Sequence, residues 1–487
     1  MAGTALGGLV ARSSPALALT RRESAGGAGH RSFVSAPGLR PPAVEVTAAA
    51  GGTASGLVFV APFALGPPAA DAQYGPLIVD DAGEPVWFLP VNGRSAMNLR
   101  VQRFHGEPVL TWYEGNVASG GYGYGGECVI ADTTYREVAR VKAGHDLQAD
   151  LHEFLITSRN TALVAIFNQR PWDLSAVGGP AEGQLVEGVV QEIDVATKEV
   201  LFEWHSVDHV GLDETYRDDL VTQPNFDYFH LNSIGVDADG DLIVSARHTS
   251  TVYKIDRRSG AVVWRLGGRK SDFALGPGAR FDFQHDARRH EDGTLTVFDN
   301  GAWGPGPGDV EPSSRGLRLA LDEQARTADL VAEYRAPAPR LATAMGDVQG
   351  LPGGNVFVGW GIAGSFSELG PSGDLRFDAR FADGSASYRA FRDPWVGRPA
   401  TRPAIVVTTD ESGRPATVHA SWNGATEVAH WQLRTGPAPG RLRAVRTAPR
   451  TGFETAIDLP APAAFLAVVA LDASGRQLAT TKVAHLA

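Results

Sequence analysis

Alternation of apolar and polar residues recurs along most of the chain, in windows that share one plan. Each window has a short alternating run, a turn rich in Asp, Asn or Gly, and a run rich in β-branched residues; the windows begin at His152, His230, His285 and Gly346. Alternation with a period of two predicts β-strands, and the Asp-Gly pairs at 239–240 and 292–293 are strong hairpin signals. Helical heptads do not occur in the sequence, so the pattern predicts an all-β fold.

The repeated windows continue into further strands. Units of about 50 to 75 residues with about four strands each are typical of propeller blades. A large β-sandwich would also show alternation, but it would not predict the same order of strands with a histidine at the head. We therefore expect a six-bladed β-propeller over residues 33–387. The expected units lie near Leu57–Val91, Met97–Ala143, Leu147–Val207, Tyr228–Gly267, Phe283–Tyr334 and Met345–Phe381.

The pattern changes after Phe381. Residues 388–403 are rich in Pro and Arg and are expected to form a connector. Residues 404–487 are typical of short strands, with Trp422 and Trp431 as core anchors. We expect this part to be a small immunoglobulin- or fibronectin-like β-sandwich.

The N-terminal segment, residues 1–32, is expected to be a signal peptide or a disordered tail. Residues 2–10 are small and apolar, and Ala16-Leu17-Ala18 matches an A-x-A cleavage site. We favour export to the cell envelope or the medium. No apolar run reaches the length of about 20 residues that a membrane helix needs.

Composition excludes several classes of function. The chain has 44 Lys and Arg against 55 Asp and Glu, and the resulting charge of −11 opposes binding to nucleic acid or anionic lipid. Cys128 is the only cysteine, so an internal disulfide or a thiolate metal cluster cannot form. His205 and His209 have the spacing of a helical metal pair, but no helix is expected there. We therefore expect neither a metal nor a cofactor.

Histidines at the heads of the repeats are the candidate chemical groups. The innermost strand of each blade lines the channel of a propeller, so residues where these strands begin face its mouth. We expect His152, His230 and His285 to meet there. Arg247 follows at the end of a hairpin that can return it towards His230, whereas His248 beside it is expected to point the other way.

Three stretches carry a resemblance to a known family: DLHEFLIT, FDYFHLNSIGVDADGDLIVSARHTSTVYKIDRRSGAVVWRLGG and FQHDARRHEDGTLTVFDNG. They resemble the arylsulfotransferase family of six-bladed propellers, with weaker similarity from about residue 56 to residue 381. The resemblance implies an exported enzyme that transfers a sulfuryl group from an aryl sulfate to a phenol without a nucleotide donor. It implies that His285 carries the sulfuryl group and that His230, His152 and Arg247 support it.

The chemistry of these residues agrees with that implication. A sulfate monoester is an anion, and its transfer needs positive donors around the sulfuryl oxygens. Arg247 supplies a planar, charged fork, and it lowers the pKa of a nearby histidine towards the neutral form that a nucleophile needs. One of the other histidines can protonate the leaving phenolate. The side chains expected to stack on an aryl ring, or else to lie in the core, are Tyr228, Phe229 and Trp303.

Two other functions remain open at this point. The propeller can be a binding module for an anionic aromatic ligand, anchored by the C-terminal domain. It can also be a hydrolase of a related anionic ester, with water as the acceptor.

Overall fold

The computed structural model describes residues 29–68, 71–118, 120–302 and 313–486. In these ranges the regular elements are β-strands and single 3-10 turns, without any α-helix, which confirms the all-β prediction. Over the same ranges, no helix has the length and apolarity to cross a membrane. Most of the expected signal peptide, together with Trp303, lies outside the described residues. The 3-10 turns are η1 (Ser175–Val177), η2 (Ser206–Asp208), η3 (Leu212–Glu214), η4 (Asp218–Leu220), η5 (Pro352–Gly354) and η6 (Gly361–Ala363).

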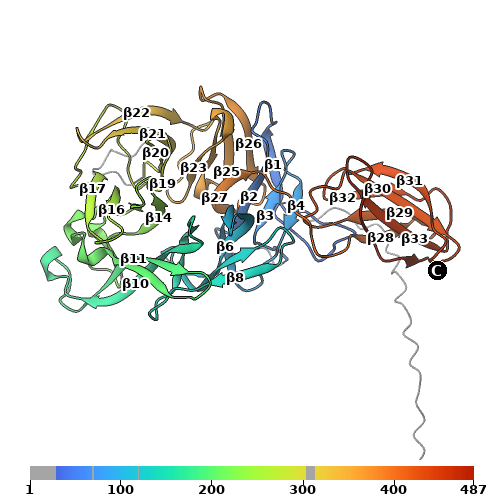
Figure 1. Ribbon diagram of the computed structural model, residues 1–487, viewed down its shortest axis with the longest axis horizontal. Coiled ribbons are helices and arrows are strands. Elements are labelled where there is room, and N and C mark those ends of the chain that lie inside the picture. Colours follow the sequence, from blue (N-terminus) through green and yellow to red (C-terminus); the bar gives the residue numbers. More distant parts are fainter. Residues whose placement is uncertain (1–28, 69–70, 119, 303–312, 487) are drawn as a thin grey trace, which may run out of the picture.

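The described strands between residues 44 and 393 form mainly antiparallel sheets arranged as a ring, which is the larger body in Figure 1. One sheet contains β27 (Ala386–Asp393), β2 (Leu57–Phe63), β3 (Leu77–Val79) and β4 (Pro85–Phe88), in that order. The next sheet comprises β5 (Ser95–Phe104), β6 (Glu107–Val117), β7 (Gly123–Ala131), β8 (Glu137–Val141), β9 (Ala149–Ile156), β10 (Thr161–Trp172), β11 (Gly183–Asp194), β12 (Val200–His205) and β13 (Phe226–Asp227). In this sheet a single residue pair, Gly126 with Ala149, joins strands β5–β8 to strands β9–β12.

Three further sheets complete the ring. The first contains β14 (Leu231–Val236), β15 (Leu242–Ala246), β16 (Thr251–Ile255) and β17 (Val262–Gly267). The second contains β19 (His285–Arg289), β20 (Thr294–Asp299), β21 (Arg315–Asp322), β22 (Thr327–Tyr334) and β18 (Ala274–Leu275). The third contains β23 (Asp347–Gly350), β24 (Val356–Gly359), β25 (Ser365–Leu369), β26 (Leu375–Phe381) and β1 (Val44–Ala48).

Strands from both ends of this region close the ring. β1 pairs with β26, with Val44 opposite Phe381, and β27 pairs with β2, with Asp393 opposite Leu57. Six strands contact one another in a closed cycle, and we call them the inner strands; in cyclic order they are β27, β5, β9, β14, β19 and β23.

The predicted connector at 388–403 is wrong in its first part, because Ala386–Asp393 is the inner strand β27. The structure buries Arg389 and Arg392 completely and pairs both with carboxylates, so their charge is satisfied inside the protein.

The C-terminal residues form two smaller sheets, at the right of Figure 1. One contains β28 (Ala404–Thr409), β29 (Pro415–Ser421) and β32 (Glu454–Asp458), and the other contains β31 (Arg443–Pro449), β30 (His430–Gly436), β33 (Phe465–Leu471), β34 (Gln477–Thr480) and β35 (Ala484–His485). Trp431 is buried in their shared core, and Trp422 packs against it. Asn423 exchanges two hydrogen bonds with the backbone of Phe88, which attaches these sheets to the ring.

Candidate active site

A cavity of about 790 Å³ opens at the centre of the ring. His152 from β9, His230 just before β14, His285 at the start of β19 and Arg247 just after β15 all contribute to its lining. The structure therefore brings together the four residues that the repeat pattern singled out.

Arg247 is a buried cation. Its backbone N–H donates to the carbonyl of His230 (2.9 Å), which is the hairpin return that the sequence suggested. The guanidinium lies over the ring of Phe283, 4.8 Å from its centre, and Nη2 donates to the carbonyl of Thr343 (3.0 Å). Within the described residues, Nε has no acceptor and the guanidinium has no carboxylate partner. Burial, followed by the nearby Arg217, lowers the pKa of Arg247 to about 10.

Two of the three histidines each have a carboxylate partner on Nδ1. His152 Nδ1 contacts Asp150, which lies two residues earlier on β9. His230 Nδ1 lies 2.5 Å from Asp227 Oδ2. Burial lowers the pKa of His230 below its ordinary value, although Asp227 opposes the shift. In this arrangement Nδ1 carries a proton, and Nε2 is left for a ligand in the cavity.

The third histidine has an amide partner instead. His285 Nδ1 lies 2.7 Å from Asn300 Oδ1, and the backbone N–H of Met345 donates to His285 Nε2 (3.2 Å). Burial and then Arg247 lower the pKa of His285 well below its ordinary value. His285 is therefore a neutral imidazole with its lone pair on Nε2.

Sequence reasoning missed several residues of the cavity. His248, which was expected to point away, lines the cavity, because it lies in the turn after β15, where strand alternation does not apply. Its Nδ1 lies 2.7 Å from the carbonyl of Asp227, and the hydroxyl of Tyr122 donates to Asp227 Oδ2 (3.1 Å). Tyr388 on β27 also lines the cavity. The acidic residues just before His152 and His230 were the available signal for the carboxylate partners.

Of the residues expected either to stack on an aryl ring or to lie in the core, Tyr228 and Phe229 lie in the core, and Trp303 is outside the described residues. Tyr228 and Phe229 are completely buried in the core between the sheets and do not line the cavity. The hydroxyl of Tyr228 bonds Ser206 Oγ (2.8 Å), which satisfies it inside the protein. The apolar part of the cavity lining instead includes Phe63, Met97, Val117, Leu151, Leu220, Pro224, Ala344 and Met345, with the rings of Tyr122 and Tyr388.

Asp227, His230 and His248 are the described residues whose positions are compatible with a shared metal ion. Ligands of a tetrahedral zinc at ordinary bond lengths lie about 3.3 Å from one another. Asp227 Oδ2 and His230 Nδ1 are 2.5 Å apart, and His248 Nδ1 faces a backbone carbonyl. This geometry is that of a hydrogen-bonded cluster.

Some residues around the cavity have a strained backbone conformation. Non-glycine residues with positive φ at or beside the lining include His230 (56°), Phe283 (53°), Asp286 (54°) and Met345 (65°). Each such residue costs about 1–3 kcal/mol, and such costs persist mainly at functional sites.

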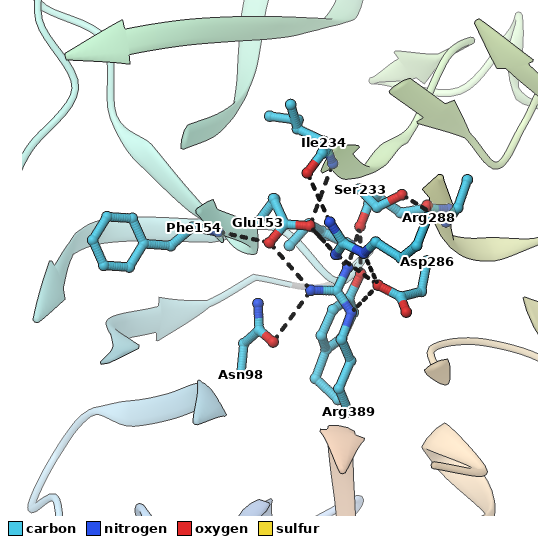
Figure 2. Close-up of polar contacts among 12 residues, drawn as sticks. Asn98, Glu153, Phe154, Ser233, Ile234, Asp286, Arg288 and Arg389 are labelled. Carbon is cyan, nitrogen blue, oxygen red and sulfur yellow. Dashed lines mark hydrogen bonds and ion pairs between the residues drawn. The ribbon is translucent and has the colours of Figure 1, made fainter. Parts of the chain in front are cut away.

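Beside the cavity, a buried network of charges spans the inner strands (Figure 2). Glu153 on β9 is its centre, in ion pairs with Arg100 (2.7 Å), Arg389 (3.3 Å) and Arg288. Arg389 and Arg288 also pair with Asp286. Burial alone would raise the pKa of Glu153, but the three arginines hold it well below its ordinary value. His152, His285 and Tyr388 each directly precede a member of this network, so the network fixes the strands that carry them.

Comparison with known protein families gives one match over most of the ring. A sequence profile described as "Arylsulfotransferase (ASST)" matches residues 100–382, which is more than half of the 487 residues. No curated protein matches the chain.

Three of the solved structures to which the chain is similar have low sequence identity to it. A protein of unknown function from Bacteroides caccae is 12% identical over 70% of this chain and 100% of its own, with a TM-score of 0.42. The Dos1 propeller is 12% identical over 71% and 70%, with a TM-score of 0.31. The Cps50 (Swd1) β-propeller domain of Myceliophteria thermophila is 12% identical over 69% and 98%, with a TM-score of 0.32.

Proposed function

The chain belongs to the arylsulfotransferase family, and we propose that it transfers a sulfuryl group from an aryl sulfate ester to a phenolic acceptor, with His285 as the carrier and without a nucleotide donor. The donor in this proposal carries an anionic sulfate on an aromatic ring, and the acceptor is a phenol.

The environment of Arg247 is the observation that carries this proposal. A buried guanidinium without a carboxylate partner is unfavourable unless an anion accompanies it. Its planar fork, with an Nε–H that has no acceptor among the described residues, suits the oxygens of a sulfate. The remaining cavity lining combines histidines with apolar and aromatic side chains, which suits an anion attached to an aromatic ring.

The first half of the reaction follows from the state of His285. Its neutral Nε2 lone pair attacks sulfur, the N–S bond forms, and the bond between sulfur and the aryl oxygen breaks with its electron pair on the phenolate. The hydrogen bond from Met345 N–H to Nε2 is released as the sulfur approaches. Arg247 stabilises the charge on the sulfuryl oxygens.

The leaving phenolate takes a proton from His230 or His152. For His230, the carboxylate of Asp227 opposes the lowering of the pKa by burial, and a bound anion raises that pKa. In the second half, the acceptor phenol returns a proton to the same ring, and its oxygen attacks sulfur to free His285.

A chromogenic aryl sulfate, incubated with the purified protein with and without added phenol, tests the proposal. Release of the phenolate that depends on added phenol supports transfer, whereas release without an acceptor identifies a hydrolase. Binding without release of phenolate from several donors would identify a binding module.

Two variants complete this test. His285→Asn is expected to abolish turnover. His105→Asn is a matched control, because His105 lies in an exposed turn with a φ of 52°, which Asn adopts readily. Full turnover by His285→Asn would contradict the assignment.

We also propose that the ring is a six-bladed propeller and that the C-terminal sheets form an immunoglobulin- or fibronectin-like sandwich. The closed cycle of inner strands supports the blade count, with strands β5–β8 and β9–β12 counted as separate blades. The shared core around Trp431 supports the sandwich.

Export is a further part of the proposal. The A-x-A motif at residues 16–18 supports cleavage after Ala18. Sequencing the N-terminus of protein recovered from outside the cytoplasm of an expressing cell tests it, and recovery of the intact chain only from the cytoplasm would contradict it.

A further inference from the structure

Asn300 directly follows β20 and is completely buried. Its Nδ2 donates two hydrogen bonds, to the carbonyls of Ala342 (2.7 Å) and Met345 (2.9 Å). Both amide hydrogens are therefore committed to acceptors, and Oδ1 is the atom that faces His285 Nδ1 at 2.7 Å.

This arrangement determines the tautomer of His285. An amide oxygen only accepts, so His285 Nδ1 must carry the proton. The other ring nitrogen gives the same result independently, because Nε2 accepts the backbone N–H of Met345. One ring therefore has a donating Nδ1 and an accepting Nε2.

The partner of His285 differs in kind from the partners of the other two histidines. His152 and His230 face Asp150 and Asp227, and a carboxylate stabilises an imidazolium. An amide fixes the orientation of the ring without adding a negative charge.

We propose that Asn300 is a positioning residue that keeps His285 in the neutral tautomer with its lone pair on Nε2, and that exchanging carboxylate for amide is how the fold separates the nucleophile from the two acids. The catalytic part of this inference rests on the proposed function, whereas the tautomer does not.

Asn300 has a role in both halves of the reaction. When Nε2 bonds to sulfur, the ring becomes an imidazolium whose remaining proton is on Nδ1. That proton still donates to Asn300 Oδ1, so the amide holds the ring in one orientation before and after transfer. The other charged or titratable groups near His285 include Asp286, Arg247, His230, His152 and Tyr388.

Nitrogen NMR of histidine-labelled protein tests the tautomer without any substrate. Long-range ¹H–¹⁵N spectra at neutral pH, with His285→Asn used for assignment, are expected to give a neutral ring protonated on Nδ1. Asn300→Ala removes the shorter of the two hydrogen bonds that favour the Nδ1-protonated ring and leaves only the 3.2 Å bond from Met345 N–H, so the fraction of ring protonated on Nε2 is expected to rise. A wild-type ring protonated on Nε2 or on both nitrogens would overturn the inference, even if the variant fails to fold.

Kinetics test the consequence. Asn300→Ala is expected to lower kcat by at least about tenfold with little change in KM; a wrong tautomer in a Ser-His-Asp triad costs about 10⁴-fold. Asn423→Ala is a matched control, since it also removes two hydrogen bonds to backbone but lies between the ring and the C-terminal sheets. Equal turnover by wild type and Asn300→Ala would overturn the positioning role.

The two proposals fail in different ways. If no aryl sulfate is turned over but the ring is protonated on Nδ1, the transferase proposal fails and the tautomer assignment stands. If aryl sulfate is turned over and the ring is protonated on Nε2, the tautomer assignment fails and the transferase proposal stands.

Discussion

The imidazole rings of His230 and His248 lie 4.5 Å apart, with 30° between their planes, and both contact Asp227. The carboxylate of Asp227 bonds His230, and its backbone carbonyl accepts from His248. The backbone N–H of His230 and the hydroxyl of Tyr122 also donate to the carboxylate of Asp227. One buried aspartate thus orients much of one wall of the cavity.

Replacing Asp227 by Asn is therefore expected to lower kcat more than it raises KM. The amide no longer stabilises an imidazolium at His230, and general acid catalysis contributes about 10²–10⁴-fold. Steady-state kinetics with an aryl sulfate and a phenol measure the effect. Asp173→Asn, at an exposed turn, is the control. An unchanged kcat in Asp227→Asn would assign the acid role to His152.

Arg247→Met is expected to separate catalysis from stability. Loss of the guanidinium should lower kcat/KM by about 10²–10³-fold, as removal of a single transition-state donor does. The free energy of unfolding should fall by about 1 kcal/mol or less, or should rise, because the variant buries no unpaired charge. Kinetics and urea denaturation of both proteins measure the two effects. A loss of stability of several kcal/mol would mean that Arg247 has a strong partner within the protein.

Sulfate is expected to raise the melting temperature of the wild type more than that of Arg247→Met, because binding to the folded state adds to the general stabilisation that sulfate gives any folded protein. Chloride at equal ionic strength is the control for screening. Equal shifts in both proteins would place the anion elsewhere.

His205 gives a prediction for pH. Its Nδ1 lies 3.2 Å from Glu187 and its Nε2 lies 3.1 Å from Glu203. The hydrogen bond to Glu187 raises its pKa from 6.5 to about 9, although burial opposes the shift. Because the folded pKa is the higher one, the imidazolium stabilises the folded state fully below pH 6.5, and the stabilisation is lost as pH rises through 9.

The variant that measures this effect is His205→Gln, which cannot carry a charge. The difference in unfolding free energy between wild type and variant should be largest at pH 6 and smallest at pH 9.5. A difference that grows with pH would contradict the raised pKa.

Removal of the central carboxylate of the charge network is expected to lower the free energy of unfolding strongly. Glu153→Gln leaves Arg100, Arg288 and Arg389 without their shared carboxylate, and breaking a buried ion pair costs about 3–5 kcal/mol. Glu45→Gln is a matched control, because Glu45 pairs with Arg380 at the surface, where such pairs contribute about 1 kcal/mol or less. Equal losses in the two variants, measured by urea denaturation, would refute the role assigned to the network.

Much of the site could be predicted because the repeat places equivalent residues at equivalent points. His230 and His285 stand where their inner strands begin, and symmetry brings them together. His152 is in the middle of β9 rather than at its start, yet it reaches the same cavity. The short turn after Ala246 returns Arg247 to the mouth, as a hairpin must.

The failures have physical reasons. Strand alternation assigned His248 to the opposite face, but residues 247–250 form a turn, and Ser250 has a positive φ. Tyr228 and Phe229 neighbour His230 in sequence, but tertiary packing buries them between sheets. The hydrogen bond between Asn300 and His285 could not be predicted from the sequence. The two residues are fifteen positions apart, and only the pairing of β19 with β20 brings them into contact.

The closure of the ring by β27 has a consequence for folding. Leu57 and Asp393 are neighbours across a strand pair although 336 residues separate them, which is a contact of very high order. Tyr388 of the cavity and Arg389 of the charge network arrive on this last strand. The ribosome must therefore finish almost the whole ring before the cavity can assemble, and recovery of turnover during refolding should follow the docking of this strand rather than the formation of the earlier hairpins.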